Sequence, residues 1–265
     1  MGKKGAIRHQ KRLAAPATYQ IPRREKTFTF HGKPGSHGIS EGIPLGIVFR
    51  DILHYAQNRK ELKYILNTKG ILIDNKAIND TRYVIGPMDI ISIPAMKKHY
   101  RVLHWQGRRK LNIVEIDEEH SHWKLLKIRN KTTLKHGFTQ INCSSGRNIY
   151  LPKPESGKYE SKWDDPATYQ TKGTIKYDVE NNKVLDFYPF KEGASVLVKA
   201  GVNTGKWGHL QHFEKRIGKN RSICIVKTPD EGQIITAMEN LFVIGTEKPE
   251  LFQYQHNSPK VSSEE

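Results

Sequence analysis

The sequence predicts an α+β fold, in which a small helix pair with a short sheet is followed by a barrel-like, β-rich region. Three observations predict it. Apolar residues follow a helical period between residues 45 and 66. Short runs of alternating apolar and polar residues, separated by Gly and Asn, fill much of residues 97–151 and 174–244. Residues 1–42 are rich in Gly and Pro without any sustained period, which predicts an extended arm.

Charge is distributed unevenly along this 265-residue chain, whose formal net charge is +17. Residues 1–33 carry nine Lys or Arg against one acid, and residues 97–110 carry six Lys or Arg and no acid. These two segments hold 14 of the 17 net charges. Because the field of a surface charge decays over about 8 Å at physiological salt, both segments predict contacts with a polyanion.

Several classes of site and location are excluded or disfavoured. Cys143 and Cys224 have no short pair spacing, so we expect neither a disulfide framework nor a zinc site, and we expect a reduced, intracellular compartment. His120 and His122 lack a third ligand at a suitable distance, and we expect no metal there. No window approaches the roughly 18 apolar residues of a membrane span, so we expect a soluble, unsecreted protein.

The arm at residues 1–42 cannot bury enough apolar surface to offset its ordering entropy, so we expect a partner to order it. Its cations are interleaved with Tyr19, Phe28 and Phe30, which a tail needing only solubility does not require. An unpaired base can stack on such aromatic rings. A solvated flexible tail is the alternative.

The helix pair is expected between residues 44 and 70. Pro44 suits a first helical turn, and the apolar residues from Leu45 to Ala56 form one stripe. Asn58 and Glu61 predict a capping box for the second helix, and Gly70 predicts its end. Strands are expected at residues 71–73, 80–85 and 90–93, with a turn at residues 74–76.

This helix pair, with its Lys69-Gly70 step, the Asp74–Lys76 turn and the run from Gly86 to Ile91, resembles the RNA-binding module named after ribosomal protein four. In that module the two helices and the adjacent loop lie on structured RNA. The resemblance implies phosphate contacts from five cations, which are Arg59, Lys60, Lys63, Lys69 and Lys76. A solvated helix face with ordinary lysines is the alternative.

The β-rich region is expected to contain strands at residues 100–105, 111–116, 123–128, 149–151, 223–226 and 234–244. Residues 152–173 are expected to form an extended loop, and Asn181-Asn182 predicts a hairpin that joins residues 174–178 to 184–190.

The glycine-rich run from Gly193 to Leu210 resembles the KOW motif, an element of small SH3-like β-barrels in which a turn at positive φ joins two strands. The resemblance implies RNA contacts from Lys199, Lys206, Trp207, His209 and Arg216. A phosphate-binding loop is excluded by spacing, because three residues separate its glycines and Trp207 follows its lysine. A tight hairpin without a ligand is the alternative.

The order of these parts resembles the eukaryotic and archaeal small-subunit ribosomal protein four family over residues 3–250. Membership implies a structural, non-enzymatic constituent of the small ribosomal subunit, with rRNA and neighbouring ribosomal proteins as partners. It implies no cofactor, small-molecule substrate, membrane or homo-oligomer, and a place in cytoplasmic ribosomes, with a nucleolar assembly stage in a eukaryote. Two departures are the acidic chain end Ser262–Glu265 and the longer, more acidic stretch at residues 154–172, whose roles the sequence does not indicate.

Two other functions share parts of this pattern. An RNA-modifying enzyme can carry the same module, but residues 97–244 offer no acid, Cys or Ser in a recognisable catalytic setting. A transcription factor can carry a KOW element, but such factors rarely begin with an arm of charge +8.

We therefore predict five segments. They are a basic arm (residues 1–42), the RNA-binding module (43–96), a central β-rich domain (97–173), the KOW barrel (174–245) and a flexible tail (246–265). The predicted RNA contacts add the cations of the two basic stretches to those above, namely Lys3, Lys4, Arg8, Lys11, Arg12, Arg23, Arg24, Lys26, Lys97, Lys98, Arg101, Arg108, Arg109 and Lys110.

Overall fold

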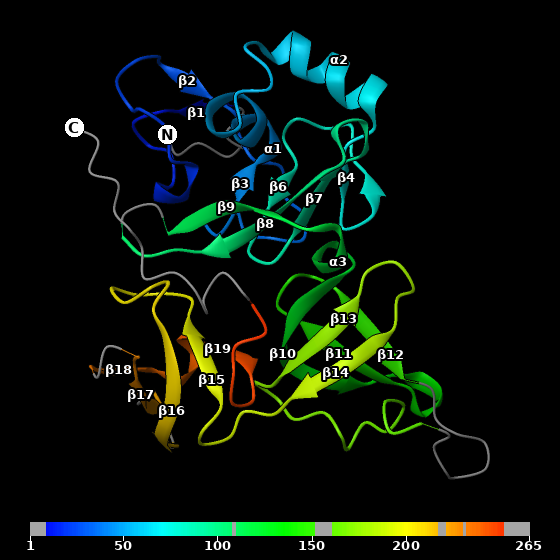
Figure 1. The fold of residues 1–265 in the computed structure, drawn as a ribbon, viewed down its shortest axis with the longest axis vertical. Coiled ribbons are helices and arrows are strands. Elements are labelled where there is room, and N and C mark those ends of the chain that lie inside the picture. Colours follow the sequence, from blue (N-terminus) through cyan, green and yellow to red (C-terminus); the bar gives the residue numbers. More distant parts are fainter. Residues whose placement is uncertain (1–8, 108–109, 152–160, 217–220, 230–231, 252–265) are drawn as a thin grey trace, which may run out of the picture. The chain divides into compact units, whose positions relative to one another are not determined.

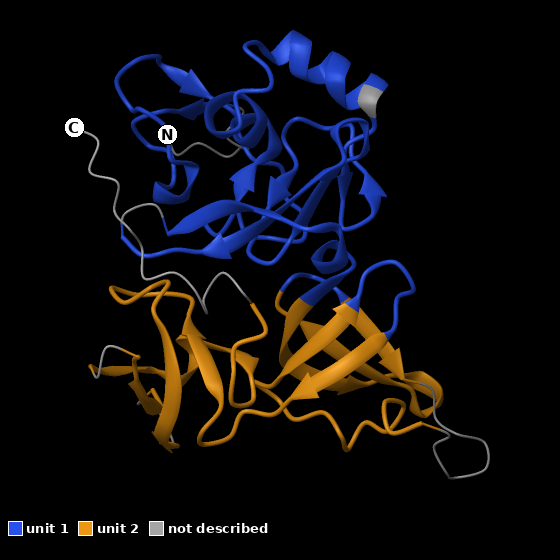
Figure 2. Ribbon diagram, viewed as in Figure 1, with its two compact units in different colours: residues 1–124, 145–147, 178–183 blue, residues 125–144, 148–177, 184–265 orange. Residues whose placement is uncertain are grey.

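The computed structural model describes residues 9–107, 110–151, 161–216, 221–229 and 232–251. The chain divides into two compact units, coloured separately in Figure 2. Unit 1 comprises residues 1–124, 145–147 and 178–183, and unit 2 comprises the remainder. Strands outnumber helices in both units (Figure 1), which confirms the α+β, β-rich fold class. The division into five segments stays a prediction.

The N-terminal segment is part of the folded body of unit 1. Strand β1 (Gln10–Lys11) pairs with β2 (Phe28–Thr29), and a 3-10 turn, η1 (Ala17–Tyr19), lies between them. Tyr19 is fully buried and Phe30 is 7% exposed, and both belong to the hydrophobic core of the unit. The expectation that a partner must order this segment is therefore wrong for residues 9–42, because these buried aromatic rings anchor it.

The first helix is shorter and wider than expected. Helix α1 (Leu45–Ile47) continues into a π-helical turn, η2 (Val48–Ile52), in which the Leu53 N–H donates to the Val48 carbonyl at 2.8 Å. His54 then adopts φ 55° and ends it, so the predicted helix does not reach Ala56. Gly46 allows Phe30 to pack on this helix, since a Cβ there would lie 2.7 Å from the Phe30 ring.

The second helix, α2 (Arg59–Lys69), has the predicted limits. Leu62 and Leu66 are buried, and Gly70 closes the helix at φ 63°. The predicted capping box is not formed within the described residues, because Glu61 Oε2 accepts from the Gln57 N–H at 2.8 Å, one residue before the N-cap, and the Asn58 side chain makes no cap hydrogen bond.

The main sheet of unit 1 has the order β5-β4-β7-β8-β9, and β3 pairs with β6 beside it. Because β8 pairs with β7 and β9 pairs with β8, residues 98–116 extend the sheet of the helix pair, although the sequence pattern favours a separate central domain for them. Asp74 and Asn75, at φ 48° and 61°, form the predicted turn. The strands are β3 (Ile43–Pro44), β4 (Leu72–Ile73), β5 (Lys76–Ala77), β6 (Val84–Ile85), β7 (Ile90–Ile93), β8 (Lys98–His104) and β9 (Leu111–Ile116), followed by helix α3 (Glu118–Ser121).

The first sheet of unit 2 has the order β12-β11-β10-β13-β14. The predicted hairpin is present and turns at Asn182, at φ 55°. Strand β11 was not predicted. Residues 161–173 form turns without a strand, and the rest of the predicted loop lies outside the described residues. The strands are β10 (Trp123–Thr133), β11 (Thr139–Cys143), β12 (Asn148–Leu151), β13 (Thr174–Asp178) and β14 (Val184–Tyr188).

The second sheet of unit 2 has the order β18-β17-β16-β15-β19. The turn between β15 and β16 places Gly201 at φ 99° and Gly205 at φ 86°, which confirms the predicted glycine turn. The predicted run at residues 234–244 is two strands, because the 3-10 turn η5 (Met238–Asn240) interrupts it. The strands are β15 (Ser195–Val198), β16 (Trp207–Glu214), β17 (Ile223–Lys227), β18 (Gln233–Ala237) and β19 (Leu241–Gly245).

Candidate nucleic-acid interface

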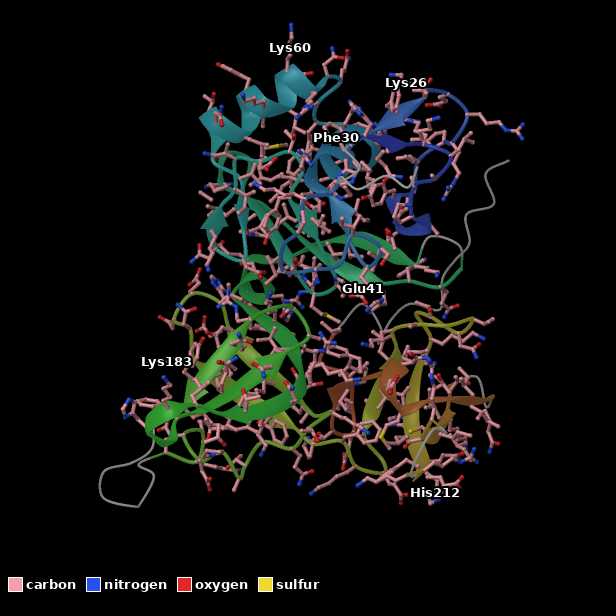
Figure 3. All side chains as sticks on the ribbon, turned by 180° about the vertical axis from the view of Figure 1, so that it is seen from behind. Lys26, Phe30, Glu41, Lys60, Lys183 and His212 are labelled. Carbon is pink, nitrogen blue, oxygen red and sulfur yellow. The ribbon has the colours of Figure 1, made fainter. Side chains whose placement is uncertain are left out.

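The outer face of α2 presents a row of cations. Arg59, Lys60 and Lys63 are exposed, while Leu62 and Leu66 of the same helix are buried. Lys60 extends outward from the helix in Figure 3. Its spacing from Lys63 puts both on one face, because residues three apart on a helix are neighbours. In the described part of the chain no carboxylate lies within ion-pair distance of Lys60 or Lys63. This row has the form of a phosphate-binding face.

Most of the predicted contact cations in the described part of the N-terminal segment are exposed as well, and these are Lys11, Arg23, Arg24 and Lys26. Arg12 is an exception, because it is 2% exposed and its Nη1 donates to the Pro22 carbonyl at 2.6 Å. Its other terminal nitrogen lies 3.8 Å from Asp51. The prediction that Arg12 contacts RNA is therefore wrong, and Tyr19, fully buried, cannot stack on a base. Lys3, Lys4 and Arg8 lie outside the described residues.

The second basic stretch is only partly available at the surface. Lys97 and Lys110 are exposed, while Lys98 pairs with Glu115 at 3.3 Å. Arg101 is 1% exposed, and its guanidinium donates to the carbonyls of His120 and Trp123. The predicted RNA contact by Arg101 is therefore wrong, because this side chain holds β8 to α3 and β10. Arg108, Arg109 and the Lys69 side chain lie outside the described part.

In unit 2 the glycine turn presents a smaller group of polar side chains. Lys206 and His209 are exposed, while Lys199 and Trp207 are half-buried. The Trp207 and His209 rings meet edge to face with centroids 6.1 Å apart. Arg216 is exposed and pairs with Glu214 at 3.2 Å. The turn thus offers a cation beside two rings, which suits an unpaired base and its phosphate.

A buried ion cluster in unit 1 was not predicted. Lys124 is 2% exposed and donates to Asp74 and to Asp89, the latter at 3.2 Å. Asp89 also lies 2.9 Å from His37 and accepts from the Gly86 N–H at 3.0 Å. Burial raises the pKa of Asp89, but Lys124, His37 and the Gly86 N–H outweigh it and bring the pKa to about 2.

A second buried amine lies in unit 2. Lys127 donates to the carbonyls of Glu239, at 3.0 Å, and Leu241. Burial, together with the nearby Lys199 and Lys172, lowers the pKa of Lys127 to about 7. A neutral amine keeps two N–H groups, which suffice for these two carbonyls. Lys127 therefore ties β10 to the segment that leads into β19.

Sequence reasoning missed both clusters and also Arg50 and Arg82, which line a cavity with the predicted Arg59. The signal for Lys124 was its position within an apolar run, Trp123 to Ile128. A lysine inside a strand that is otherwise apolar needs buried hydrogen-bond acceptors, which are two carboxylates for Lys124 and two carbonyls for Lys127. In the part of the chain that the structure describes, no group of three or more His, Cys, Asp or Glu is placed to hold a metal ion, and no helix is long and apolar enough to cross a membrane.

Two family models match this chain. The model of the ribosomal family S4e matches residues 96–184, and that of the RS4NT (NUC023) domain matches residues 4–40. The small ribosomal subunit protein eS4 of Desulfurococcus amylolyticus is 34% identical over 254 residues, which are 94% of this chain and 96% of that relative. The protein of the same name from Methanocaldococcus jannaschii is also 34% identical, over 94% of this chain and 98% of its own.

The fold also has a solved counterpart. The crystal structure of the 30S ribosomal protein S4e from Thermoplasma acidophilum matches with a TM-score of 0.61 at 21% identity, over 78% of this chain and 96% of that one. Fold and surface define a basic, β-rich α+β protein with several exposed cationic faces, a pattern typical of nucleic-acid-binding proteins. Since relatives at 34% identity cover nearly its whole length, the chain belongs to the ribosomal family S4e. The resemblance found in the sequence is thereby confirmed.

Proposed function

We infer that the chain is a structural constituent of the small ribosomal subunit, where it binds rRNA and contacts neighbouring ribosomal proteins. One observation carries this inference: relatives named small ribosomal subunit protein eS4 align with 94% of the chain. We further propose that it acts as a single copy, without a cofactor, in cytoplasmic ribosomes. The expected five-segment organisation belongs to this proposal, with the N-terminal segment as a basic surface of unit 1.

We propose that binding rests chiefly on phosphate neutralisation. Each Lys or Arg that contacts a phosphate releases counterions, so affinity falls with salt by about 0.7 to 0.9 log units per log unit of salt and contact. Shape and backbone contacts then set the register of the protein on folded RNA. The proposed contacts that the structure finds exposed are Lys11, Arg23, Arg24, Lys26, Arg59, Lys60, Lys63, Lys76, Lys97, Lys110, Lys206, His209 and Arg216.

Three residues have a weaker claim to such contacts. Lys98, Lys199 and Trp207 are only half-buried, so each keeps some accessible surface. We propose that Trp207 contributes through its ring beside His209, and that Lys98 contributes less than Lys97 because Glu115 offsets its charge.

Co-sedimentation with small ribosomal subunits tests the assignment. We expect the full chain to sediment with small subunits depleted of their own copy, and to bind small-subunit rRNA in a filter assay with a strong salt dependence. Sedimentation with RNA polymerase instead would support a transcription factor. A modified nucleoside in RNA incubated with the protein and cofactors would support an enzyme, and either result would overturn the proposal.

A further inference from the structure

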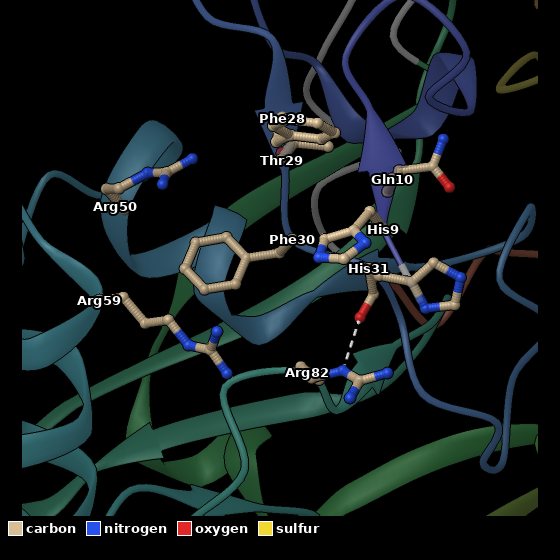
Figure 4. Close-up of a pocket in the computed structure, with 9 residues that line it drawn as sticks. All are labelled: His9, Gln10, Phe28, Thr29, Phe30, His31, Arg50, Arg59 and Arg82. Atoms are coloured by element: carbon tan, nitrogen blue, oxygen red, sulfur yellow. Dashed lines mark hydrogen bonds between the residues drawn. The ribbon is translucent and has the colours of Figure 1, made fainter. Parts of the chain in front are cut away.

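A cavity of about 330 Å³ opens in unit 1 and is shown in Figure 4. Five segments of the chain form it. They are β1 with the residue before it, β2 with the two residues after it, η2, the start of α2 and the loop before β6. It is lined by His9, Gln10, Phe28, Thr29, Phe30, His31, Arg50, Arg59 and Arg82. Its size is at the lower end of the ~300–1,000 Å³ range of small-ligand sites.

The cavity lining is cationic. It contains three arginines and no carboxylate among its described residues. Arg82 is held in place by a hydrogen bond from its Nε to the His31 carbonyl at 3.1 Å, and its terminal nitrogens make no hydrogen bond to the residues that the structure describes. Arg50 is partly neutralised, because it donates to both oxygens of Asp51. Within the described chain no carboxylate lies within ion-pair distance of Arg59 or Arg82, so these two supply the excess charge.

The lining is also aromatic. Phe28 is 53% exposed, although a side chain of this kind is normally buried in a core. The His9 ring lies beside it, with the centroids 5.7 Å apart. Phe30 also lines the cavity, packed against Gly46 and with the Arg50 guanidinium 4.7 Å from its ring centroid. An exposed ring at the edge of an arginine-lined cavity offers a flat apolar surface next to an anion site.

We propose that this cavity receives one unpaired nucleotide of an RNA strand. Its base lies against Phe28 and His9, and its phosphate is held by Arg59 and Arg82. An anionic peptide would use the arginines but leave the exposed Phe28 ring without a flat partner, whereas a nucleotide uses both. The proposal rests on the rRNA-binding function and assigns that function a specific site. It also explains why the segment around β1 and β2 is folded against the helices, since this arrangement assembles the cavity.

The test measures binding of a short fluorescein-labelled oligouridylate, and separately of small-subunit rRNA, to the full-length protein. Oligouridylate suits the purpose because its bases are little stacked on one another and are free to enter a cavity. Two variants probe the site, Phe28→Ala and the double variant Arg59→Gln, Arg82→Gln. Matched controls are Phe138→Ala and Arg129→Gln, which change exposed residues of unit 2 outside every proposed contact.

We expect Phe28→Ala to weaken oligouridylate binding about tenfold, within the range expected for removal of one base stack, and to leave the salt dependence unchanged. The arginine variant should weaken binding and reduce the salt slope by about 0.7 for each arginine. Both controls should bind as the wild type does. Circular dichroism establishes that each variant is folded, which the exposure of Phe28 and Arg59 favours.

The outcomes separate the two proposals. If wild-type protein does not bind rRNA, the proposed function fails. If it binds rRNA and Phe28→Ala binds oligouridylate as Phe138→Ala does, the rRNA-binding function stands and the cavity is not a nucleotide site. A competition experiment with uridine monophosphate completes the test. Displacement of oligouridylate by uridine monophosphate at equal concentration would identify a free nucleotide as the ligand and overturn the assignment to an RNA strand.

Discussion

Unit 1 carries its positive charge in two contrasting settings. Lys124 lies between Asp74 and Asp89 with 2% of its surface exposed, whereas Lys60 and Lys63 stand in solvent on α2 without a carboxylate partner among the described residues. The buried amine has exchanged water for two carboxylates. The exposed amines of Lys60 and Lys63 keep their water and counterions, and an RNA phosphate can displace these counterions.

This contrast separates cations that stabilise the fold from cations that are free to meet a polyanion. A buried charge needs its partners permanently, since an unpaired charge in the interior costs several kcal/mol. An exposed lysine contributes almost nothing to folding, but its whole field is available to a polyanion. Net charge therefore overstates the binding surface, because the +17 of this chain includes Arg12, Arg101 and Lys124, which are committed to the interior.

The largest expected effect is that of Lys124→Met. This variant leaves Asp74 and Asp89 buried without their cation, which should lower the free energy of unfolding of unit 1 by about 3–5 kcal/mol. Urea denaturation measures it. The loss should shrink at mildly acidic pH, where the pKa values of the two carboxyls, raised in the absence of Lys124, allow them to become neutral. Lys63→Met is the matched control, with an expected change within about 0.5 kcal/mol. An equal loss in the two variants would contradict the contrast.

Lys127→Met tests the buried amine of unit 2 through pH. The pKa of Lys127 in the fold is about 7 against an ordinary value of 10.5. Between these values the unfolded chain binds one proton more than the folded chain, so the stability of the wild type rises with pH in this window. Relative to Lys127→Met, it should rise by about 1.4 kcal/mol per pH unit from pH ~7 to pH ~9. Thermal unfolding of both proteins across this range measures the difference, and parallel pH profiles would show that Lys127 stays charged in the fold.

Arg101→Met should have a smaller effect. It leaves the carbonyls of His120 and Trp123 without their donor and removes a guanidinium that lies 4.4 Å from the Trp123 ring centroid. The expected loss of stability is about 1–3 kcal/mol, as for buried acceptors left unsatisfied. The salt slope of RNA binding should stay unchanged, measured on the folded fraction. A reduced slope would return Arg101 to the contact surface.

The sequence predicted those elements whose signals are local. The limits of α2 follow from an apolar stripe between Asn58 and Gly70, and the hairpin of β13 and β14 follows from alternation around an Asn-Asn turn. The N-terminal segment could not be predicted in this way. Tyr19 and Phe30 anchor an irregular stretch to the core, and period analysis does not detect burial outside helices and strands.

The candidate site was predictable where one element decides exposure. Lys60 and Lys63 lie opposite an apolar helix face, so the helical period alone places them in solvent. The predicted RNA contact of Arg101 was wrong because β8 is buried on both faces. Tyr100, Val102 and Leu103 lie in the interior together with Arg101, so the alternation of apolar and polar residues does not indicate which side chains are exposed. The cavity around Phe28 depends on segments from residue 9 to residue 82, which only the tertiary structure brings together.

The smallest energetic effect is expected for the exposed lysines, and it is the most informative about function. The variant Lys60→Gln, Lys63→Gln should leave stability within about 0.5 kcal/mol per site, because neither side chain has an ion-pair partner in the described structure. Its rRNA affinity should fall uniformly across RNA sequences, and the salt slope should fall by about 0.7 to 0.9 for each phosphate that a lysine no longer neutralises. Filter binding over a salt series measures both quantities.

Lys131→Gln, which changes an exposed lysine of β10 outside the proposed contacts, serves as the control. An unchanged slope in the double variant would remove Lys60 and Lys63 from the interface and leave the N-terminal cations and the Arg59–Arg82 cavity to hold the RNA.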